Sequence, residues 1–274
     1  MRKLVLLFLI AGIGFSGNIQ KEKVYTVKEP PVLELKIVSG KIIIKQWDKK
    51  QVKVSLKVRY WDEEPRIEME KSGDRIYVEV KGKNKFCLFC SRRSPKAYLV
   101  VSTPGGYSGE IKTVSGDIYF EGTPEYIKAT TVSGEISFSD VTAKKINLHS
   151  VSGDFKGNRL VARSVGLSTV SGDIYINNIV APEVKGETVS GDVSLASEKA
   201  VFEEGEWRFT SVSGDIRIAF DSKPEISIFE SRTVSGDIEL DNETATGKLR
   251  KRFGDKGIRI YIKTVSGDIR ISGI

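Results

Sequence analysis

A five-residue unit, Val-Ser-Gly-Asp-Ile, recurs with small changes along most of the chain. Nine glycines mark these units: Gly40, Gly116, Gly134, Gly153, Gly172, Gly191, Gly214, Gly236 and Gly267. From Gly116 to Gly191 the intervals are 18, 19, 19 and 19 residues, and the later intervals are 23, 22 and 31. A nearly constant period is typical of repeat proteins, in which each repeat packs mainly against its two neighbours. The chain is therefore expected to fold as a stack of similar coils.

Within one repeat, the apolar or small residues fall in pairs two residues apart, and steps of three separate the pairs. In the copy that begins at Val151 the pairs are Phe155 and Gly157, Leu160 and Ala162, and Val165 and Leu167. A spacing of two indicates a strand with one buried face, whereas a step of three breaks the alternation and indicates a corner. Each repeat is thus predicted to form three short strands. Because parallel crossovers are almost always right-handed, we expect an all-β, right-handed parallel β-solenoid, or β-helix.

The first residues indicate export. Residues 1–16 read as a signal peptide, because Arg2 and Lys3 precede an apolar run over residues 4–15 that is too short to span a bilayer comfortably. An uncleaved anchor is the alternative. The protein is therefore expected in the periplasm, on the cell surface or outside a bacterial cell.

The remaining chain divides into two parts. Residues 17–105 contain alternating strands without the strict period and a Cys-containing insertion, and they are predicted to form an N-terminal antiparallel β cap with the first strands. A cap is expected because an open solenoid end exposes an unpaired sheet edge. Residues 106–274 are predicted to form the solenoid repeats.

The Ser-Gly-Asp step of each repeat is predicted to be a bend, because glycine adopts positive φ and Asp or Ser can hydrogen-bond nearby backbone. Stacking would align the bends into a structural turn ladder. A Ca²⁺ or cationic-ligand ladder is the alternative, but each coil supplies only one carboxylate, so neither metal nor cofactor is expected. Whether the valine of the unit or the threonine before it points inward stays open. The ladder residues are Gly116, Asp117, Gly134, Glu135, Gly153, Asp154, Gly172, Asp173, Gly191, Asp192, Gly214, Asp215, Gly236, Asp237, Gly267 and Asp268.

Cys87 and Cys90 lie in a basic, irregular insertion over residues 81–97. In an exported protein, such a close pair is most simply a local disulfide. Free thiols, or a metal or redox role, are the alternatives. Zinc would need two further ligands, and the single histidine, His149, belongs to a repeat.

Two later repeats are enlarged, one around residues 203–207 and the other around residues 248–252. Extra residues in such repeats are expected to form loops on one side of the stack. The second contains Lys248, Arg250, Lys251 and Arg252, so it is a candidate site for an anionic partner such as lipid or a cell-wall polymer; a solvated loop is the plain alternative. Nucleic acid is not expected as a partner, because aromatic residues are not interleaved with the basic ones.

Several of these segments together resemble a known family. An export signal precedes Val38-Ser39-Gly40 and Trp47-Asp48, residues 98–101 form an apolar strand before Pro104, and Thr-Val-Ser-Gly-Asp-Ile units complete the chain. This arrangement resembles a bacterial family of exported domains of unknown function described as candidate adhesins. The resemblance implies a solenoid-like β fold at the cell envelope and brings no catalytic residues. Some members of that family are linked to envelope-stress signalling.

The function expected from these observations is a non-enzymatic, adhesin-like binding or structural module of the cell envelope. Its partner would be an envelope or surface glycan, protein or anionic lipid. An envelope-stress sensor or regulator is one alternative. A polysaccharide-acting β-helix enzyme is another, but acidic residues that recur once per repeat, in register, behave as structural residues. The sequence does not indicate an oligomeric state.

Overall fold

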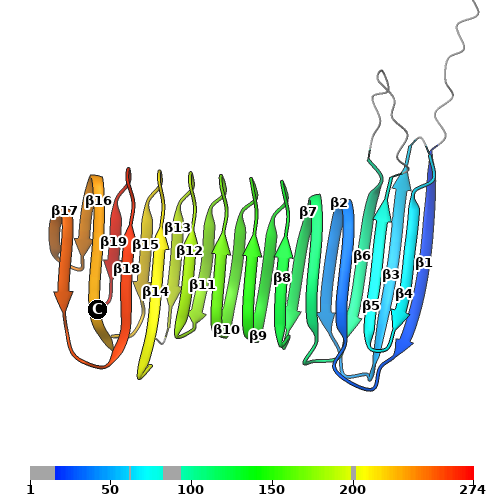
Figure 1. Cartoon of the computed structure of the whole chain (residues 1–274), viewed down its shortest axis with the longest axis horizontal. Coiled ribbons are helices and arrows are strands. Elements are labelled where there is room, and N and C mark those ends of the chain that lie inside the picture. Colours follow the sequence, from blue (N-terminus) through cyan, green and yellow to red (C-terminus); the bar gives the residue numbers. More distant parts are fainter. Residues whose placement is uncertain (1–15, 62, 83–93, 199–201) are drawn as a thin grey trace, which may run out of the picture.

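In the computed structural model, the described residues are 16–61, 63–82, 94–198 and 202–274, and over these ranges the chain is all-β, with 19 strands and no helix. The strands form one elongated stack (Figure 1). No helix long and apolar enough to cross a membrane occurs in these ranges. Almost all of the predicted signal peptide, together with Cys87 and Cys90, lies outside the described residues.

The middle of the stack consists of parallel strands that precede and follow the Val-Ser-Gly-Asp turns, except that β7 runs through its own Val-Ser-Gly-Asp unit. These strands are β7 (Ser108–Gly122), β8 (Tyr126–Thr130), β9 (Ile136–His149), β10 (Phe155–Ser168), β11 (Ile174–Val180), β12 (Glu183–Glu187), β13 (Val193–Ser197), β14 (Glu204–Thr210) and β15 (Ile216–Phe220). Phe155 pairs with Ile136 on one side and Ile174 on the other, and Ile174 pairs with Val193. One sequence period therefore corresponds to one step along the stack, as the repeat predicts.

Inward-facing side chains of successive coils form continuous buried columns. One column is at most 1% exposed and contains Ile118, Ile136, Phe155, Ile174, Val193, Ile216, Ile269 and Ile238. Each such side chain contributes about 1.5–3 kcal/mol when it is buried. Because every coil shares this core with its neighbours, a single coil is stable only as part of the stack.

A second corner follows the strand after each turn, where the sequence shows its step of three. Asp140, Arg159 and Asn178 occupy this corner in three successive coils, with φ of 51°, 54° and 63°. Asp and Asn tolerate this left-handed region better than most residues. The Arg159 guanidinium also lies 2.8 Å from a carboxylate oxygen of Asp140. The corner is therefore built from residues that take positive φ without being glycine.

The N-terminal end is not stacked in sequence order. Strand β2 (Val32–Gln46) is parallel to β7 on one side and to both β5 (Arg75–Lys81) and β6 (Lys96–Thr103) on the other. Beyond it lie antiparallel pairs of β1 (Gly17–Thr26) with β3 (Gln51–Tyr60), β3 with β6, and β4 (Arg66–Ser72) with β5. The strands that follow β2 in the sequence thus lie outside it, and β7 returns to its inner side.

The C-terminal end is interleaved in the same manner. Strands β14 and β15 pair with β18 (Gly257–Lys263) and β19 (Ile269–Ser272), which come last in the sequence. Strand β16 (Ile226–Leu240) lies on the other side of β18 and β19, and β17 (Glu243–Arg252) is antiparallel to β16 (Figure 1). The expectation that successive turns of the chain lie directly on one another therefore fails for the last coils, because the final strands fill a gap between β14–β15 and β16.

Candidate functional site

The turn glycines form a column in which each residue lies against the carbonyl of its neighbour. A Cβ on Gly172 would be 2.2 Å from the Gly153 oxygen, and a Cβ on Gly153 would be 1.9 Å from the Gly134 oxygen. Five turn glycines do not have positive φ, namely Gly116, Gly134, Gly153, Gly172 and Gly191, although Gly40, Gly214, Gly267 and Gly236 do. The sequence predicts that these turns need glycine because of positive φ. In the middle coils, glycine is instead required because neighbouring backbones approach closely.

The carboxylates after these glycines connect one coil to the next. The Asp192 amide donates to Oδ1 of Asp173 at 2.8 Å, and the Asp173 amide donates to Oδ1 of Asp154 at 3.0 Å. The same bond joins Asp215 to Asp192, Asp268 to Asp215, Asp237 to Asp268 and Glu135 to Asp117. Over the described ranges, no group of three or more His, Cys, Asp or Glu side chains is placed to hold a metal ion. The geometry of the column is that of turn hydrogen bonding.

Glu135 interrupts this pattern because its side chain is longer. Its carboxylate accepts a hydrogen bond from Nζ of Lys156 at 2.6 Å instead of from the next turn. That hydrogen bond raises the pKa of the Lys156 amino group. The position therefore carries a surface ion pair where the neighbouring coils have a backbone bond.

Threonine, and not valine, is the inward residue of the turn. Thr169, for example, is 3% exposed, whereas Val170 is 44% exposed. The Thr169 hydroxyl donates to the Gly153 carbonyl at 3.4 Å, and the Thr131 hydroxyl accepts the Gly134 amide at 3.0 Å. In these coils the hydroxyl bonds to backbone groups of the turn, which an isopropyl group cannot do, whereas the equivalent hydroxyls of Thr188 and Ser211 are buried without a hydrogen-bond partner among the described residues. This resolves the question that the sequence left open.

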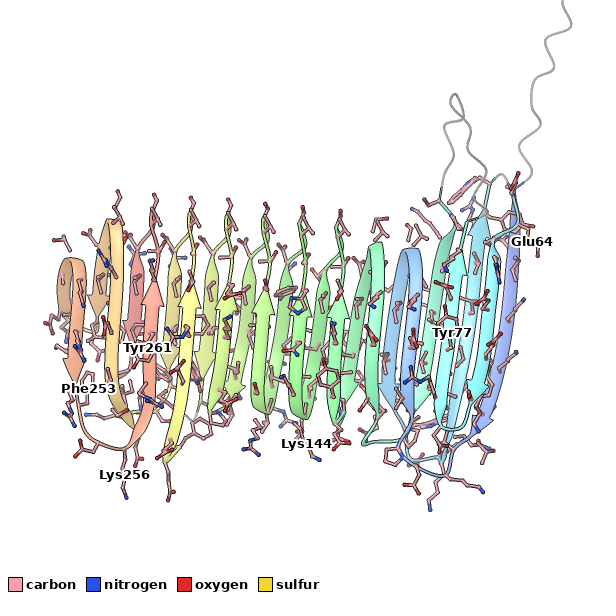
Figure 2. The ribbon with its side chains drawn as sticks, in the orientation of Figure 1. Glu64, Tyr77, Lys144, Phe253, Lys256 and Tyr261 are labelled. Atoms are coloured by element: carbon pink, nitrogen blue, oxygen red, sulfur yellow. The ribbon has the colours of Figure 1, made fainter. Side chains whose placement is uncertain are left out.

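The outward valines form a single row along the turn edge, which we call the valine edge. It consists of Val114, Val132, Val151, Val170, Val189, Val212, Val265 and Val234, each between 41% and 72% exposed. Figure 2 shows a regular row of side chains projecting from this edge of the stack. Neighbouring strands lie about 4.8 Å apart, so the row is a periodic apolar surface rather than scattered exposed residues. Sequence reasoning could find this row only after the direction of threonine was known.

The basic residues predicted to lie in a loop are in strand β17, because this segment pairs with the otherwise open edge of β16. All four are ion-paired: Lys248 and Arg250 with Glu230 at 3.0 and 3.6 Å, Lys251 with Glu243, and Arg252 with Asp255. Residues 204–207 of the other enlarged coil also lie in a strand, β14, in which Trp207 is fully buried. An anionic partner at β17 stays a prediction, and it would have to compete with these internal carboxylates.

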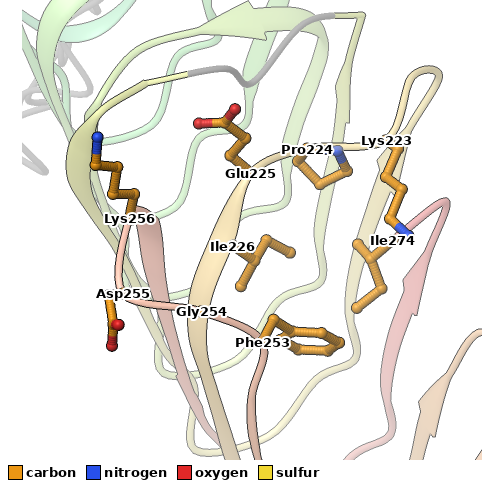
Figure 3. Close-up of a pocket in the computed structure, with 9 residues that line it drawn as sticks. All are labelled: Lys223, Pro224, Glu225, Ile226, Phe253, Gly254, Asp255, Lys256 and Ile274. Carbon is orange, nitrogen blue, oxygen red and sulfur yellow. The ribbon is translucent and has the colours of Figure 1, made fainter.

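A cavity of about 460 Å³ lies between the start of β16 and the segment after β17 (Figure 3). Ile226, Phe253 and Ile274 face one another across it, and Lys223 and Lys256 lie at its rim (Figure 3). Its apolar floor lies where the end of the hydrophobic core meets solvent. Charges of both signs surround it, so the cavity does not select one class of ligand.

The fold and these surfaces define an all-β repeat protein that displays regular columns of side chains and whose turn residues hold the coils together. The chain belongs to the Toastrack DUF4097 family, a domain family of unknown function whose pattern matches residues 32–272. No curated protein matches it.

Solved structures of similar fold include proteins from Bacteroides and Parabacteroides species. A candidate adhesin from Bacteroides fragilis is 15% identical over 93% of this chain and 97% of its own, with a TM-score of 0.55. A candidate adhesin from Parabacteroides merdae is 12% identical over 92% and 96%, with a TM-score of 0.47. A candidate lipid-binding protein from Parabacteroides distasonis has the same identity and TM-score, over 92% and 97%. At these identities the Bacteroides fragilis likeness supports the fold alone.

Proposed function

We propose that this protein is a non-enzymatic, exported binding module of the bacterial cell envelope that acts in an adhesin-like manner. The observation that carries the proposal is the valine edge, eight half-exposed apolar side chains in one row. Exposed apolar residues that lie together, in contrast to singly scattered ones, mark interaction sites. The candidate adhesin from Bacteroides fragilis, which shares the fold, is consistent with this function.

The binding mechanism is multivalent contact with a rigid surface. Backbone bonds fix each valine relative to the next: the Ser171 amide donates to the Val151 carbonyl, and the Ser190 amide donates to the Val170 carbonyl, both at 2.8 Å. A ligand that contacts several valines at once loses little protein conformational entropy, because the side chains are already ordered. Weak contacts can therefore add up along the edge.

The turn carboxylates support a binding role more than a catalytic one. Oδ1 of Asp173 accepts a backbone hydrogen bond, and the same geometry recurs from coil to coil. A general acid or base needs a carboxyl group placed differently from its neighbours, with an environment that shifts its pKa. We also propose that the stack winds right-handed and that the antiparallel strands at its two ends act as caps over open sheet edges.

The test is retention of envelope components by the immobilised protein. We expect the triple variant Val151→Ser, Val170→Ser and Val189→Ser to lose most of the retained material. Val161 is the matched control, because it is 41% exposed but lies outside the turn edge. Val161→Ser should therefore leave retention unchanged.

Two results would contradict the proposal. If the triple variant retains as much material as the original protein, the valine edge is not the binding surface. If the original protein retains no envelope component, the proposed binding function is wrong. Cell fractionation with surface proteolysis tests export, and a polysaccharide hydrolysis assay with Asp173→Ala and Asp192→Ala variants tests the enzymatic alternative.

A further inference from the structure

A groove lies on the sheet face after the turns, near the C-terminal end of the stack, and is separate from the valine edge. One column of outward residues there runs through Tyr175, Ser194, Arg217, Arg270 and Glu239, each paired with the next in the strand register. The repeat gives this column no constant residue, in contrast to the aspartates two residues earlier. The stacking of the coils therefore does not fix the residue type at this position of the repeat.

The floor of the groove comes from the parallel column two residues further on. Ala196 pairs with Ala219, and Ala219 pairs with Ser272, so three small side chains lie side by side. The resulting hollow has a volume of about 420 Å³, and Tyr175 and Asp241 also line it. The Asp241 carboxylate accepts the amides of Gly273 and Ile274 at 2.7 and 3.2 Å, which holds it in place. Small residues beside long ones thus create the depression.

Two arginines line one side, and their charges are already compensated. Arg217 Nη2 lies 2.5 Å from Oδ2 of Asp215. Arg270 donates through Nε to Glu239 and through Nη2 to Asp268, both at 2.9 Å. A guanidinium has five N–H donors, and within the described residues Nη1 of Arg270 has no hydrogen-bond partner. Together with Asp241, the carboxylates at the groove outnumber its two guanidinium groups, so the groove offers donors and acceptors but no excess positive charge.

Tyr175 supplies an accessible aromatic ring at one end. Its side chain is 55% exposed. Tyr119 stands in the same column three coils away, but its hydroxyl is bonded to Glu121 at 2.6 Å and to Ser139 at 2.7 Å. A free aromatic face is a platform for an apolar surface, and the phenol provides a polar edge. Of these two tyrosines, Tyr175 is the one free to meet a ligand.

We propose that this groove binds a neutral sugar or short neutral glycan. A sugar ring has an apolar C–H face, which matches Tyr175 and the alanine floor, and a rim of hydroxyls that both donate and accept hydrogen bonds. Arg217 and Arg270 would donate to these hydroxyls, and Glu239 would accept from them. A phosphate or sulfate would instead favour uncompensated cations, so the carboxylates at Arg217 and Arg270 select against it.

The experiment is isothermal titration calorimetry of the protein with neutral oligosaccharides, namely hexasaccharides of glucan, mannan, xylan and chitin types. Polygalacturonate serves as an anionic probe. We expect at least one neutral oligosaccharide to bind, and Tyr175→Ala to weaken that binding by about tenfold. Ala219→Trp, which fills the floor of the groove, should weaken it at least as much. Tyr119→Ala is the matched control and should not change it.

The outcomes separate this site from the valine edge. Binding that is lost in the Tyr175 and Ala219 variants, but kept in the triple valine variant, supports the groove whether or not the valine edge binds envelope material. Absence of binding by every neutral oligosaccharide overturns the proposal, as does binding of polygalacturonate alone. Binding that is unchanged by Tyr175→Ala and Ala219→Trp places the sugar elsewhere and overturns it as well.

Discussion

Replacing Gly172 by alanine tests the close contact on which the stack depends. The added Cβ would lie 2.2 Å from the Gly153 carbonyl oxygen, on backbone that cannot rotate away. Relieving this overlap requires a separation of about 1 Å between two coils. Three hydrogen bonds of 2.8 to 3.0 Å join the coils at this turn, from Ser171 to Val151, from Phe155 to Asp173 and from Asp173 to Asp154, in addition to the longer bond from Thr169 to Gly153.

These contacts set the size of the effect. Losing or stretching three hydrogen bonds costs about 0.5–1.5 kcal/mol each, and overpacking alone costs about 1–3 kcal/mol. Because a separation of about 1 Å stretches these bonds without breaking all of them, the lower part of the summed range applies, and we expect Gly172→Ala to lower the free energy of unfolding by about 2.5–4 kcal/mol. Gly254 is the matched control: a Cβ there would meet nothing within 4 Å, and its φ is not positive. Gly254→Ala should change stability by less than about 0.5 kcal/mol.

Urea unfolding, followed by tryptophan fluorescence and circular dichroism, measures the difference. With a typical denaturant dependence, the midpoint of Gly172→Ala should fall by about 1 M. The two signals must coincide, because repeat arrays can lose cooperativity. An unfolding midpoint equal to that of the original protein, with unchanged slope, would falsify the argument that carbonyl contacts exclude a side chain from the glycine column.

Three further predictions follow from single side chains. Val170→Thr should leave the free energy of unfolding nearly unchanged. Thr169→Val should lower it by about 1–2 kcal/mol, because it removes the hydroxyl at that buried position. Equal effects of the two variants in thermal unfolding would contradict the assignment of inward and outward residues. Asp173→Ala should lower the free energy of unfolding by about 1 kcal/mol. Adding Ca²⁺ at roughly 5 mM, an excess over weak sites, should shift the melting temperature of neither the variant nor the original protein. A shift in the original protein alone would indicate an ion site. The hydrogen bond from Lys36 holds the pKa of the Glu34 carboxyl below its usual value, so its stabilising contribution is present above the unfolded-state pKa near 4.5 and is lost as the pH falls through the lower folded-state value. Urea titrations of Glu34→Gln and the original protein should therefore converge in acid, and a constant difference would refute this.

The repeat period predicts the middle of the molecule because one physical rule applies to every coil. A step of 19 residues places Phe155 against Ile174, and the same step brings aspartate amides within reach of the preceding carboxylate. The break in alternation after Gly157 predicts the second corner, where Arg159 takes positive φ. These features are local, so the sequence of one coil and its neighbours contains them.

The ends and the turn direction depend on interactions that the period does not contain. Thr169 is inward and its hydroxyl bonds to the Gly153 carbonyl, whereas a prediction from apolar residues alone would turn Val170 inward. The order of β16 to β19 depends on which strand covers an open edge, and several orders would preserve the same register. The basic residues of β17 suggest a loop by composition, yet they pair along β16 as an edge strand whose charges discourage further pairing.

Binding specificity should lie where the repeat is broken, because the repeated positions are occupied by scaffold contacts. The Asp192 carboxylate accepts the Asp215 amide, the Asp192 amide donates to the Asp173 carboxylate, and Gly172 cannot accept a side chain. Neither residue can therefore vary without loosening the coils. Outward positions two and four residues after the aspartate carry no such constraint, and there the large Tyr175 and the small Ala219 line the same hollow. The regular edge can thus provide repeated, weak contact, while the irregular face provides selection of a particular ligand. A surface that served only as a spacer would need neither a hollow nor a free aromatic ring, and the stack has both on one face.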